Sequence, residues 1–405
     1  MPRWLKSFLG NLLLLVVSVG VAYFVGELVF FRFVVPELSL NLRAHLPETA
    51  EVLLQNSKSG AVPRDYVAIL GDSYAEGLGE WALAGAGDRA KPYHSANVIH
   101  ERTGRDVASF GKGGNGSVQG LVVRPARILA GNRCIVFPDI EDPKQIVVYF
   151  YEGNDLHDNL NVLEILRQRG FHGDIPAAVE FVAERYGAAA GRKCHAHFWE
   201  TVVRMAQFVY RDQREGHDRF RMPAPSGNSF VVGGRVVDVP AGLQGPSLEL
   251  EDDEIVRAVA LYDRSLAWLR RRFPQAPVTV AYIPAPLSAY RLAGDTVRIH
   301  SLAQRRSEFP AVLVGRNSDL ICRLVREVTL RHGAGFLDTR PALRAAASAE
   351  VIHGPTDWYH FNETGYRLLG TLVSERLKNP AAADPCADPP APDSNVSTTQ
   401  ARNPG

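Results

Sequence analysis

The sequence predicts an α/β fold in which a parallel β-sheet is flanked by helices. Short apolar runs alternate with helical patterns along most of the chain, which is typical of strands connected by crossover helices. The 405 residues, of which 46% are hydrophobic and 22% charged, suffice for a sizeable core in one large domain or two ordinary ones. The chain has no internal repeat, so a repeat architecture is not expected.

Five strands and five helices are expected in this fold. The strands are apolar runs at 66–70, 106–110, 146–151, 278–283 and 335–338. The helices fall near 94–103, 117–129, 253–272, 318–331 and 364–377. The helix at 253–272 has the clearest pattern, because its apolar residues share one face: Ile255, Val259, Tyr262, Leu266 and Leu269.

The N-terminus carries a candidate membrane anchor. Residues 8–26 are apolar apart from one Asn and one Ser, and roughly 20 apolar residues span a bilayer as a helix. Arg3 and Lys6 precede this segment, so the positive-inside rule keeps the N-terminus in the cytoplasm and exports the rest to the periplasm. A cleaved signal peptide with residues 18–20 as its cleavage site is the alternative. The apolar residues continue to Val35, however, which favours an uncleaved anchor in a bacterial inner membrane.

The chain is expected to divide into four parts. Residues 1–35 form the cytoplasmic N-terminus and the anchor, 36–64 a linker, 65–378 the α/β domain, and 379–405 a disordered Pro/Ala-rich tail. A long insertion at 156–250 interrupts the domain. An insertion of this length is either a lid or substrate wall, or a decoration that adds stability.

The insertion itself shows helical patterns at 161–168, 177–187 and 197–213, followed by a hairpin at 229–239. Its aromatic side chains offer stacking surfaces for sugars, but their helical spacing favours positions in the core. These aromatic residues are Phe171, Phe181, Tyr186, Phe198, Trp199, Phe208 and Tyr210.

If the domain is exported, its four cysteines lie in a compartment in which disulfides form. Cys322 lies in a helical pattern and is expected to be a buried thiol, whereas Cys386 lies in the polar tail. If a bridge exists, Cys134 and Cys194 are the favoured pair, although sequence does not establish connectivity. The run at 194–197 also offers Cys and His ligands, but no partner motif accompanies it, so no metal site is expected.

The charge balance argues against some partners. A formal net charge of +1 and the absence of a basic stripe with interleaved aromatics exclude a dedicated nucleic-acid binder. The run Arg270–Arg272 closes a helix, where cations complement the helix dipole. Nothing in the sequence calls for a cofactor.

Polar residues follow three of the predicted strands, and a fourth group precedes the last helix. The first strand ends in Gly-Asp-Ser with Ser73, and the second in a Gly-rich turn that contains Gly114. The third ends in Glu-Gly-Asn-Asp with Asn154, and Asp357 and His360 stand three residues apart before the last helix. Each group alone also fits ordinary turn or cap chemistry. Their common position at the carboxyl edge of one sheet favours a binding or catalytic site.

These four blocks, in this order, resemble the SGNH/GDSL hydrolase superfamily. The resemblance implies a three-layer α/β/α, flavodoxin-like SGNH fold with a five-stranded parallel sheet and covers about residues 66–377. It also implies a serine nucleophile, Ser73, whose own N–H is one oxyanion donor, with Gly114 and Asn154 as the others. His360 would be the base and Asp357 would orient it, as a Ser-His-Asp triad requires.

Three features depart from the family pattern or leave it open. The first block reads GDSY rather than GDSL, which is harmless because the fourth residue is not catalytic. Glu152 occupies the position of the family's first glycine in the third block, which puts the local backbone in doubt. Gly111 and Gly113 compete with Gly114 for the role of second oxyanion donor.

The predicted function is that of a serine esterase acting through an acyl-serine. The run "YEGNDL", the anchor and the export signal are similar to SGNH-type proteins of bacterial surface-polysaccharide acetylation, so the expected partner is an acylated glycan or a small ester. An O-acetyltransferase that takes its acyl group from a membrane acyl-donor protein is an alternative. A lipid esterase and a catalytically silent glycan-binding domain are the others.

Overall fold

The computed structural model describes residues 2–85, 92, 94–190, 197–215, 227–302 and 305–386. Its central sheet has five strands in the order β10-β6-β3-β1-β2, and every neighbouring pair is parallel. The strands are β1 (Val67–Leu70), β2 (Val107–Ser109), β3 (Gln145–Tyr151), β6 (Val278–Ile283) and β10 (Gly335–Asp338). All five predicted strands are confirmed, and the chain reverses its winding direction between β1 and β3, where doubly wound sheets bind ligands.

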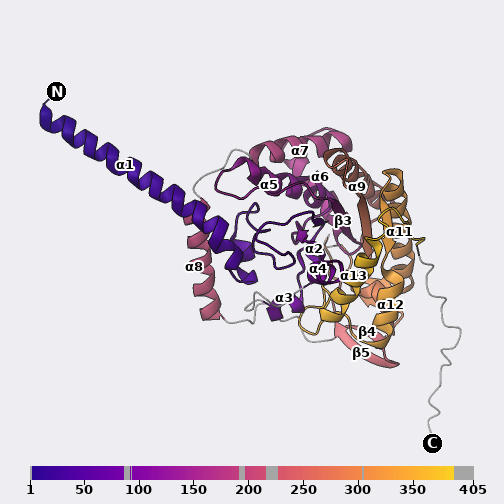
Figure 1. The fold of residues 1–405 in the computed structure, drawn as a ribbon. Helices are drawn as coiled ribbons and strands as arrows, with labels where there is room; N and C mark the ends of the chain where they lie inside the picture. The colour runs from indigo at the N-terminus through magenta and orange to yellow at the C-terminus, as the bar shows by residue number, and fades with distance from the viewer. Residues whose placement is uncertain are drawn as a thin grey trace, which may run out of the picture.

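Helices cover both faces of the sheet, which confirms the three-layer α/β/α architecture (Figure 1). Alternate residues of β1 point to opposite faces: Val67 and Ile69 join one core cluster, and Ala68 and Leu70 the other. The first face is covered by α4 (Ser95–Thr103), α12 (Arg340–Ala349) and α13 (Glu363–Arg376). The second is covered by η4 (Gln119–Val123), α5 (Arg124–Ala130), α9 (Asp252–Arg272) and α11 (Val312–Arg331).

One predicted helix has a different form in the structure, and one observed helix was not predicted. The pattern at 117–129 forms a π-helical turn, η4, that continues into α5. Helix α12 was not predicted, because it is rich in Ala and buries only one large apolar side chain, Leu343. Helix α9 follows its prediction closely: a capping box between Glu251 and Glu254 starts it, and three arginines lie in its last turn.

The insertion forms helices α6 (Asp155–Gln168), α7 (Ile175–Ala190) and α8 (His197–Glu215) and then the hairpin β4 (Gly227–Val232) and β5 (Arg235–Pro240). Apolar residues of α6 and α7 form one core cluster with residues of η4 and α9. These two helices therefore thicken the second helical layer. The hairpin gains a third strand from β7 (Arg291–Leu292), and β8 (Thr296–Arg298) pairs with β9 (Glu308–Pro310).

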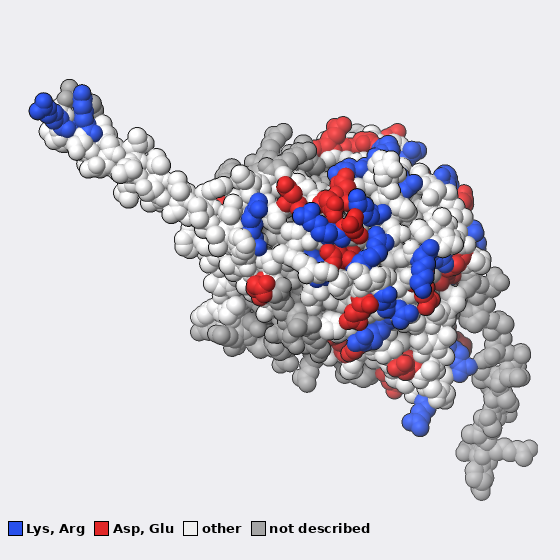
Figure 2. All heavy atoms as spheres, viewed as in Figure 1, with Lys and Arg blue, Asp and Glu red and all other residues white. Residues whose placement is uncertain are grey.

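The N-terminal helix α1 (Arg3–Val29) projects away from the domain (Figure 1). It continues through a π-helical turn, η1 (Phe30–Val34), and the combined helical segment is long and apolar enough to cross a membrane. In Figure 2 the helix is white along its length and carries Lys and Arg at its free tip. Only its end enters the domain, where Phe31 and Val35 are fully buried.

The segment predicted as a linker, 36–64, is packed against the domain over much of its length. Leu53 and Leu54 are fully buried. The Gln55 side chain donates to the carbonyl of Ser109 and accepts from its N–H, both at 2.7 Å, as a neighbouring strand would. The linker interpretation is therefore wrong for this part, because its buried side chains complete the edge of the sheet beside β2.

Two expectations for the C-terminal region are also wrong. Cys322 is buried as predicted, but it forms a disulfide with Cys386. Residues 379–386 do not belong to a disordered tail, because Phe336 of β10 donates to Ala382 and accepts from Asp384. This backbone pairing brings Cys386 to α11. The predicted bridge between Cys134 and Cys194 stays a prediction, since Cys194 and His195 lie outside the described residues, as does the tail after 386.

Candidate active site

The first strand ends in a tight turn that presents Ser73. Gly71 has φ +141°, and a Cβ at this position would lie 2.5 Å from the carbonyl of Tyr149, so only glycine fits. Asp72 then caps the short helix α2 (Ser73–Glu76) by accepting the N–H of Tyr74 at 2.9 Å. Asp72 is therefore a helix cap, as ordinary turn chemistry predicts. The same turn places the Ser73 side chain at the carboxyl edge of the sheet.

Asp72 is fully buried and binds the neighbouring serine: Ser73 Oγ donates to Asp72 Oδ2 at 3.2 Å. Burial raises the pKa of Asp72 to about 6, although the Tyr74 N–H and the nearby His360 partly offset this effect. Asp72 is therefore a structural cap whose carboxyl group also holds the Ser73 hydroxyl.

The Gly-rich turn after β2 lies directly against α2. A Cβ on Gly111 would meet the backbone of Ala75 at 2.4 Å, and the Gly111 N–H donates to Ser109 Oγ at 3.2 Å. The Gly113 N–H donates to Glu76 Oε2 at 2.7 Å. Two of the three candidate oxyanion donors are therefore already engaged.

Gly114 is the remaining candidate. Its φ of +73° requires the left-handed region that favours glycine, and a Cβ there would meet nothing within 4 Å. Among the hydrogen bonds of the described residues, none uses the Gly114 N–H. The geometry thus favours the predicted register, with Gly114 as the available donor of this turn.

Glu76 and Arg43 hold this turn, and neither was predicted. Burial alone would raise the pKa of Glu76, but Arg43, Lys112 and the Gly113 N–H outweigh it and leave the pKa below its usual value. Arg43 also donates to the carbonyls of Glu76 at 3.1 Å and Gly111 at 3.3 Å. No sequence signal marks Arg43, because it stands in the segment taken for a linker.

The third block places Asn154 at the start of α6. Its Nδ2 donates to Asp158 Oδ2 at 2.9 Å, and its buried Oδ1 has no hydrogen-bond partner among the described residues. Burial first, and then the charge of Asp72, raise the pKa of Asp158 to about 7. The same two causes raise the pKa of Asp155 well above its usual value. The spacing of four residues between Asn154 and Asp158 is a sequence signal that could have found this pair.

Glu152, the departure from the family pattern, points away from the site into the core. Its carboxylate accepts hydrogen bonds from Tyr282 Oη, the Ala285 N–H, Ser288 Oγ and Ser318 Oγ. Ser318 Oγ also receives a bond from Arg340, which pairs with Asp338 and Asp319. Glu152 therefore joins β3 to β6 and α11, and it has no contact with Ser73 in the described structure.

Asp357 and His360 form a pair at the end of the loop before α13. His360 Nδ1 and Asp357 Oδ2 lie 2.6 Å apart. Burial alone would raise the pKa of Asp357, but the hydrogen bond and charge of His360 and the Tyr359 N–H lower it below its usual value. This bond fixes the imidazole through Nδ1 and leaves Nε2 for another partner.

Residues that follow Ser73 hold the loop of His360 in place. Glu80 accepts the backbone N–H groups of Thr356 and Asp357. Tyr74 Oη donates to the Tyr359 carbonyl at 2.8 Å, and its ring lies 5.5 Å from the His360 ring. The first and last blocks are therefore in direct contact, although no Ser73–His360 hydrogen bond forms in the described structure. Catalytic hydrogen bonds are often loose before substrate binds.

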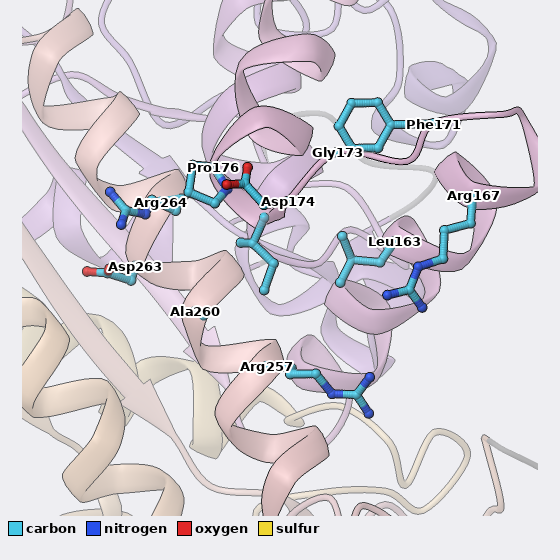
Figure 3. Close-up of a pocket in the computed structure, with 11 residues that line it drawn as sticks. Leu163, Arg167, Phe171, Gly173, Asp174, Pro176, Arg257, Ala260, Asp263 and Arg264 are labelled. Atoms are coloured by element: carbon cyan, nitrogen blue, oxygen red, sulfur yellow. The ribbon is translucent and has the colours of Figure 1, made fainter.

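A cavity lies apart from these residues. It measures about 460 Å³ and lies among α6, α7 and α9, with Arg167, Arg257 and Arg264 at its wall (Figure 3). None of the predicted site residues lines it. In the described residues, the one cluster with metal-ligand geometry is Cys322, Asp338 and Cys386. Its two sulfur atoms are joined as a disulfide, so they do not offer thiolates to a metal.

No protein-family model matches the chain, and no curated protein matches it in sequence. Solved structures are similar to it in fold. An extracellular lipase from Streptomyces rimosus is 16% identical with a TM-score of 0.38, over 76% of this chain and 98% of the lipase. Phospholipase A1 from Streptomyces albidoflavus is 13% identical with a TM-score of 0.37, over 77% and 98%. An acetyl-xylooligosaccharide esterase from Geobacillus is 10% identical with a TM-score of 0.34, over 80% and 99%.

These identities and TM-scores are too low to assign the chain a family or a role. The strand order and the two helical layers on either side of the sheet agree with the fold that the SGNH/GDSL resemblance implies, so the predicted fold is confirmed. The roles of the site residues rest on their own geometry and chemistry.

Proposed function

We propose that this protein is a membrane-anchored serine esterase of the SGNH/GDSL type. The observation that carries the proposal is the 2.6 Å bond between Asp357 and His360 in a loop held against the helix that begins with Ser73. Nucleophilic acyl transfer needs an oriented imidazole that can reach a serine, and here the imidazole lies in a loop that contacts the residue next to Ser73.

The reaction follows from these positions. His360 Nε2 accepts the proton of Ser73 as Oγ attacks the ester carbonyl, and Asp357 stabilises the imidazolium that forms. The carbonyl oxygen becomes an oxyanion, which accepts hydrogen bonds from the N–H groups of Ser73 and Gly114 and from Asn154 Nδ2. His360 then donates its proton to the leaving alcohol. Water, activated by His360, releases the acid and restores Ser73.

The finer substrate proposal is an O-acetyl group on an extracytoplasmic glycan. It is supported by the "YEGNDL" resemblance and by an apolar helix long enough to anchor the chain in the bacterial inner membrane. Residues 27–35 support an uncleaved anchor, because Glu27, Phe31 and Val35 are buried against the domain at the end of the same helix. The catalytic domain then faces the periplasm.

The test uses the full chain in detergent, because residues near Phe31 belong to the core. Hydrolysis of p-nitrophenyl acetate is measured for wild type and Ser73→Ala, with the folding of both checked by circular dichroism. We expect the wild type to hydrolyse the ester and the variant to be at background. Equal background rates from two folded proteins would contradict a general esterase. Acetyl transfer to an added glycan, dependent on Ser73, would identify the O-acetyltransferase alternative instead.

A further inference from the structure

Helix α8 carries an apolar stripe on an exposed face. Trp199, Val203, Ala206 and Tyr210 follow one another at intervals of four, three and four residues, which places them on one face of the helix. All four are exposed, Trp199 by 60% and Tyr210 by 58%. The expectation that the aromatics of the insertion are core residues is therefore wrong for these two.

Polar residues lie along one side of this stripe. Glu200, Arg204 and Gln207 are one position further along the helix than three members of the stripe, and all three are exposed. Glu200 and Arg204 form an ion pair across one turn. An exposed helix with an apolar stripe beside a charged one is typical of a helix lying in a membrane interface.

Helix α8 packs against the end of the candidate membrane span. The Phe198 ring lies 6.3 Å from that of Tyr23 and 5.0 Å from that of Phe30, and the Phe198 N–H donates to Glu27 Oε1 at 3.3 Å. Figure 1 shows α8 crossing the end of α1 on the side of the domain from which α1 emerges.

The position of this contact along α1 sets the depth of α8. The apolar segment begins at Phe8, and a helix rising about 1.5 Å per residue crosses a hydrocarbon core of about 30 Å in roughly 20 residues, ending near Glu27. Residues 23–30 therefore lie at the outer boundary of the bilayer. Trp199, next to Phe198, is then at headgroup level, where Trp and Tyr are enriched.

Two further exposed apolar residues extend the surface. Phe33 follows α1, and the segment of Ile135 is held near the end of this helix because Arg32 donates to the Ile135 carbonyl at 3.1 Å. We call this surface the membrane-facing patch; it consists of Phe33, Ile135, Trp199, Val203 and Tyr210. An apolar surface that continues an apolar, membrane-crossing helix is most simply covered by lipid.

We propose that α8 lies in the headgroup region of the bilayer that α1 spans, with the membrane-facing patch against lipid. This proposal rests on the proposed membrane anchor and adds a second, peripheral contact that fixes the domain on the membrane surface. The occupant of the patch is the bilayer, and a second copy of the chain is the alternative that the test addresses.

A short chain of contacts connects helix α8 to the candidate active site. The Phe208 ring of α8 lies 4.5 Å from the ring of His45, in the short helix η3 (Leu40–His45). Arg43 of the same helix holds the carbonyls of Glu76 and Gly111. The loops around Ser73 are therefore tied to the membrane-bound side of the domain. Esters on molecules close to the membrane surface are the substrates within reach.

The test uses tryptophan fluorescence of the full chain in vesicles whose lipids are brominated near the interface. The chain has five tryptophans, and Trp81 and Trp358 are buried in the domain while Trp268 is partly buried. Trp4 reports insertion of α1, and Trp199 reports α8. Variants Trp4→Phe, Trp4→Phe/Trp199→Phe and, as the matched control, Trp4→Phe/Trp268→Phe are compared with wild type.

We expect Trp4→Phe to retain quenching by the brominated lipid, Trp4→Phe/Trp199→Phe to lose most of it, and the Trp268 control to keep it. Equal quenching of Trp4→Phe and Trp4→Phe/Trp199→Phe would overturn the proposal. Absence of Trp199 quenching in a protein that elutes as a dimer would also overturn the proposal, because a second copy of the chain would then cover the patch. Failure of the anchor itself has a different signature, since substituting Trp4 would then leave the quenching of wild type unchanged.

Discussion

The carboxyl groups that follow β3 and β1 fall into two groups, which differ in their hydrogen bonds. Glu152 accepts hydrogen bonds from four donors on neighbouring elements and lies at the centre of a network that includes Arg340. Asp155 and Asp158, together with Asp72 after β1, have few donors, and Asp155 Oδ1 has none among the described residues.

The difference in hydrogen bonding goes with a difference in role. Burial raises the pKa of Asp72, Asp155 and Asp158, so their carboxyl groups keep protons at higher pH than usual. In their protonated form, these carboxyl groups would not repel an oxyanion that develops near Ser73 and Asn154. The hydrogen bonds of Glu152 therefore indicate a stabilising role, whereas the carboxyl groups around Ser73 fit the proposed catalytic role.

The largest effect is expected from removing the nucleophile. Ser73→Ala should lower kcat/KM for p-nitrophenyl acetate by roughly 10⁴-fold or more, because the acyl-serine no longer forms. Ser288→Ala is the matched control, since Ser288 binds Glu152 on the other side of β3. That control should lose stability and keep its activity. Similar activity losses in both variants would contradict the separate roles of Ser73 and of the Glu152 network.

Asp357→Asn tests the orientation of the base. It keeps the shape of the side chain but removes the charge that stabilises an imidazolium at His360, so kcat should fall by about 10²–10⁴-fold. The steady-state rate measures this effect, and the unfolding midpoint in urea should change little. An activity near that of wild type would show that Asp357 serves only as a turn residue.

Glu152→Ala tests the structural side of the comparison. The substitution leaves the buried Ala285 N–H and Ser318 Oγ without an acceptor, while Tyr282 Oη and Ser288 Oγ keep a backbone carbonyl each. Together with the cavity left by the side chain, this should lower the free energy of unfolding by about 3–5 kcal/mol. Urea denaturation at neutral pH measures this change. A loss below about 1 kcal/mol would remove the distinction between the two groups of carboxylates.

The smallest effect concerns pH. Because the pKa of Asp158 is raised to about 7, its carboxyl is protonated below that pH and becomes charged beside Asn154 above it. The activity of wild type should therefore decline on the alkaline side. Asp158→Asn, which cannot ionise, should exceed it by roughly tenfold near pH 8 after scaling both to about pH 6. Superimposable pH profiles would contradict this role for Asp158.

The same raised pKa affects stability with a definite sign. The folded state holds the Asp158 proton to higher pH than the unfolded chain, so this residue makes the fold less stable as pH rises from about 4 towards 7. Asp158→Asn should weaken that decline, which urea denaturation at the two ends of this range measures.

The sequence predicted the five strands and the four blocks because both depend on local patterns. Apolar runs mark the strands, and the residues that end parallel strands must meet at one edge. It could not predict the part played by Glu152, whose donors come from residues 130 or more positions away. It named Gly114 as the second oxyanion donor only through the family resemblance, because the bonds that engage Gly111 and Gly113 come from Ser109 and Glu76 and leave no local signal.

Two other predictions failed because they also depend on contacts between residues that are far apart in the sequence. The bridge from Cys322 to Cys386 depends on the pairing of residues near 383 with β10, which no local signal announces. The aromatics of α8 were expected in the core, because helical spacing identifies an apolar face without saying what covers it. Trp199 and Tyr210 are exposed, so helical spacing alone does not place a side chain in the core.

The most direct test of the central claim is covalent labelling of Ser73. The full chain is treated with a fluorophosphonate, which phosphonylates activated serines, and the modified peptide is identified by mass spectrometry. The account predicts a single adduct on Ser73 in wild type and its loss in His360→Ala, whose fold is checked by circular dichroism. An unlabelled Ser73 in folded wild type, or undiminished labelling without His360, would contradict it.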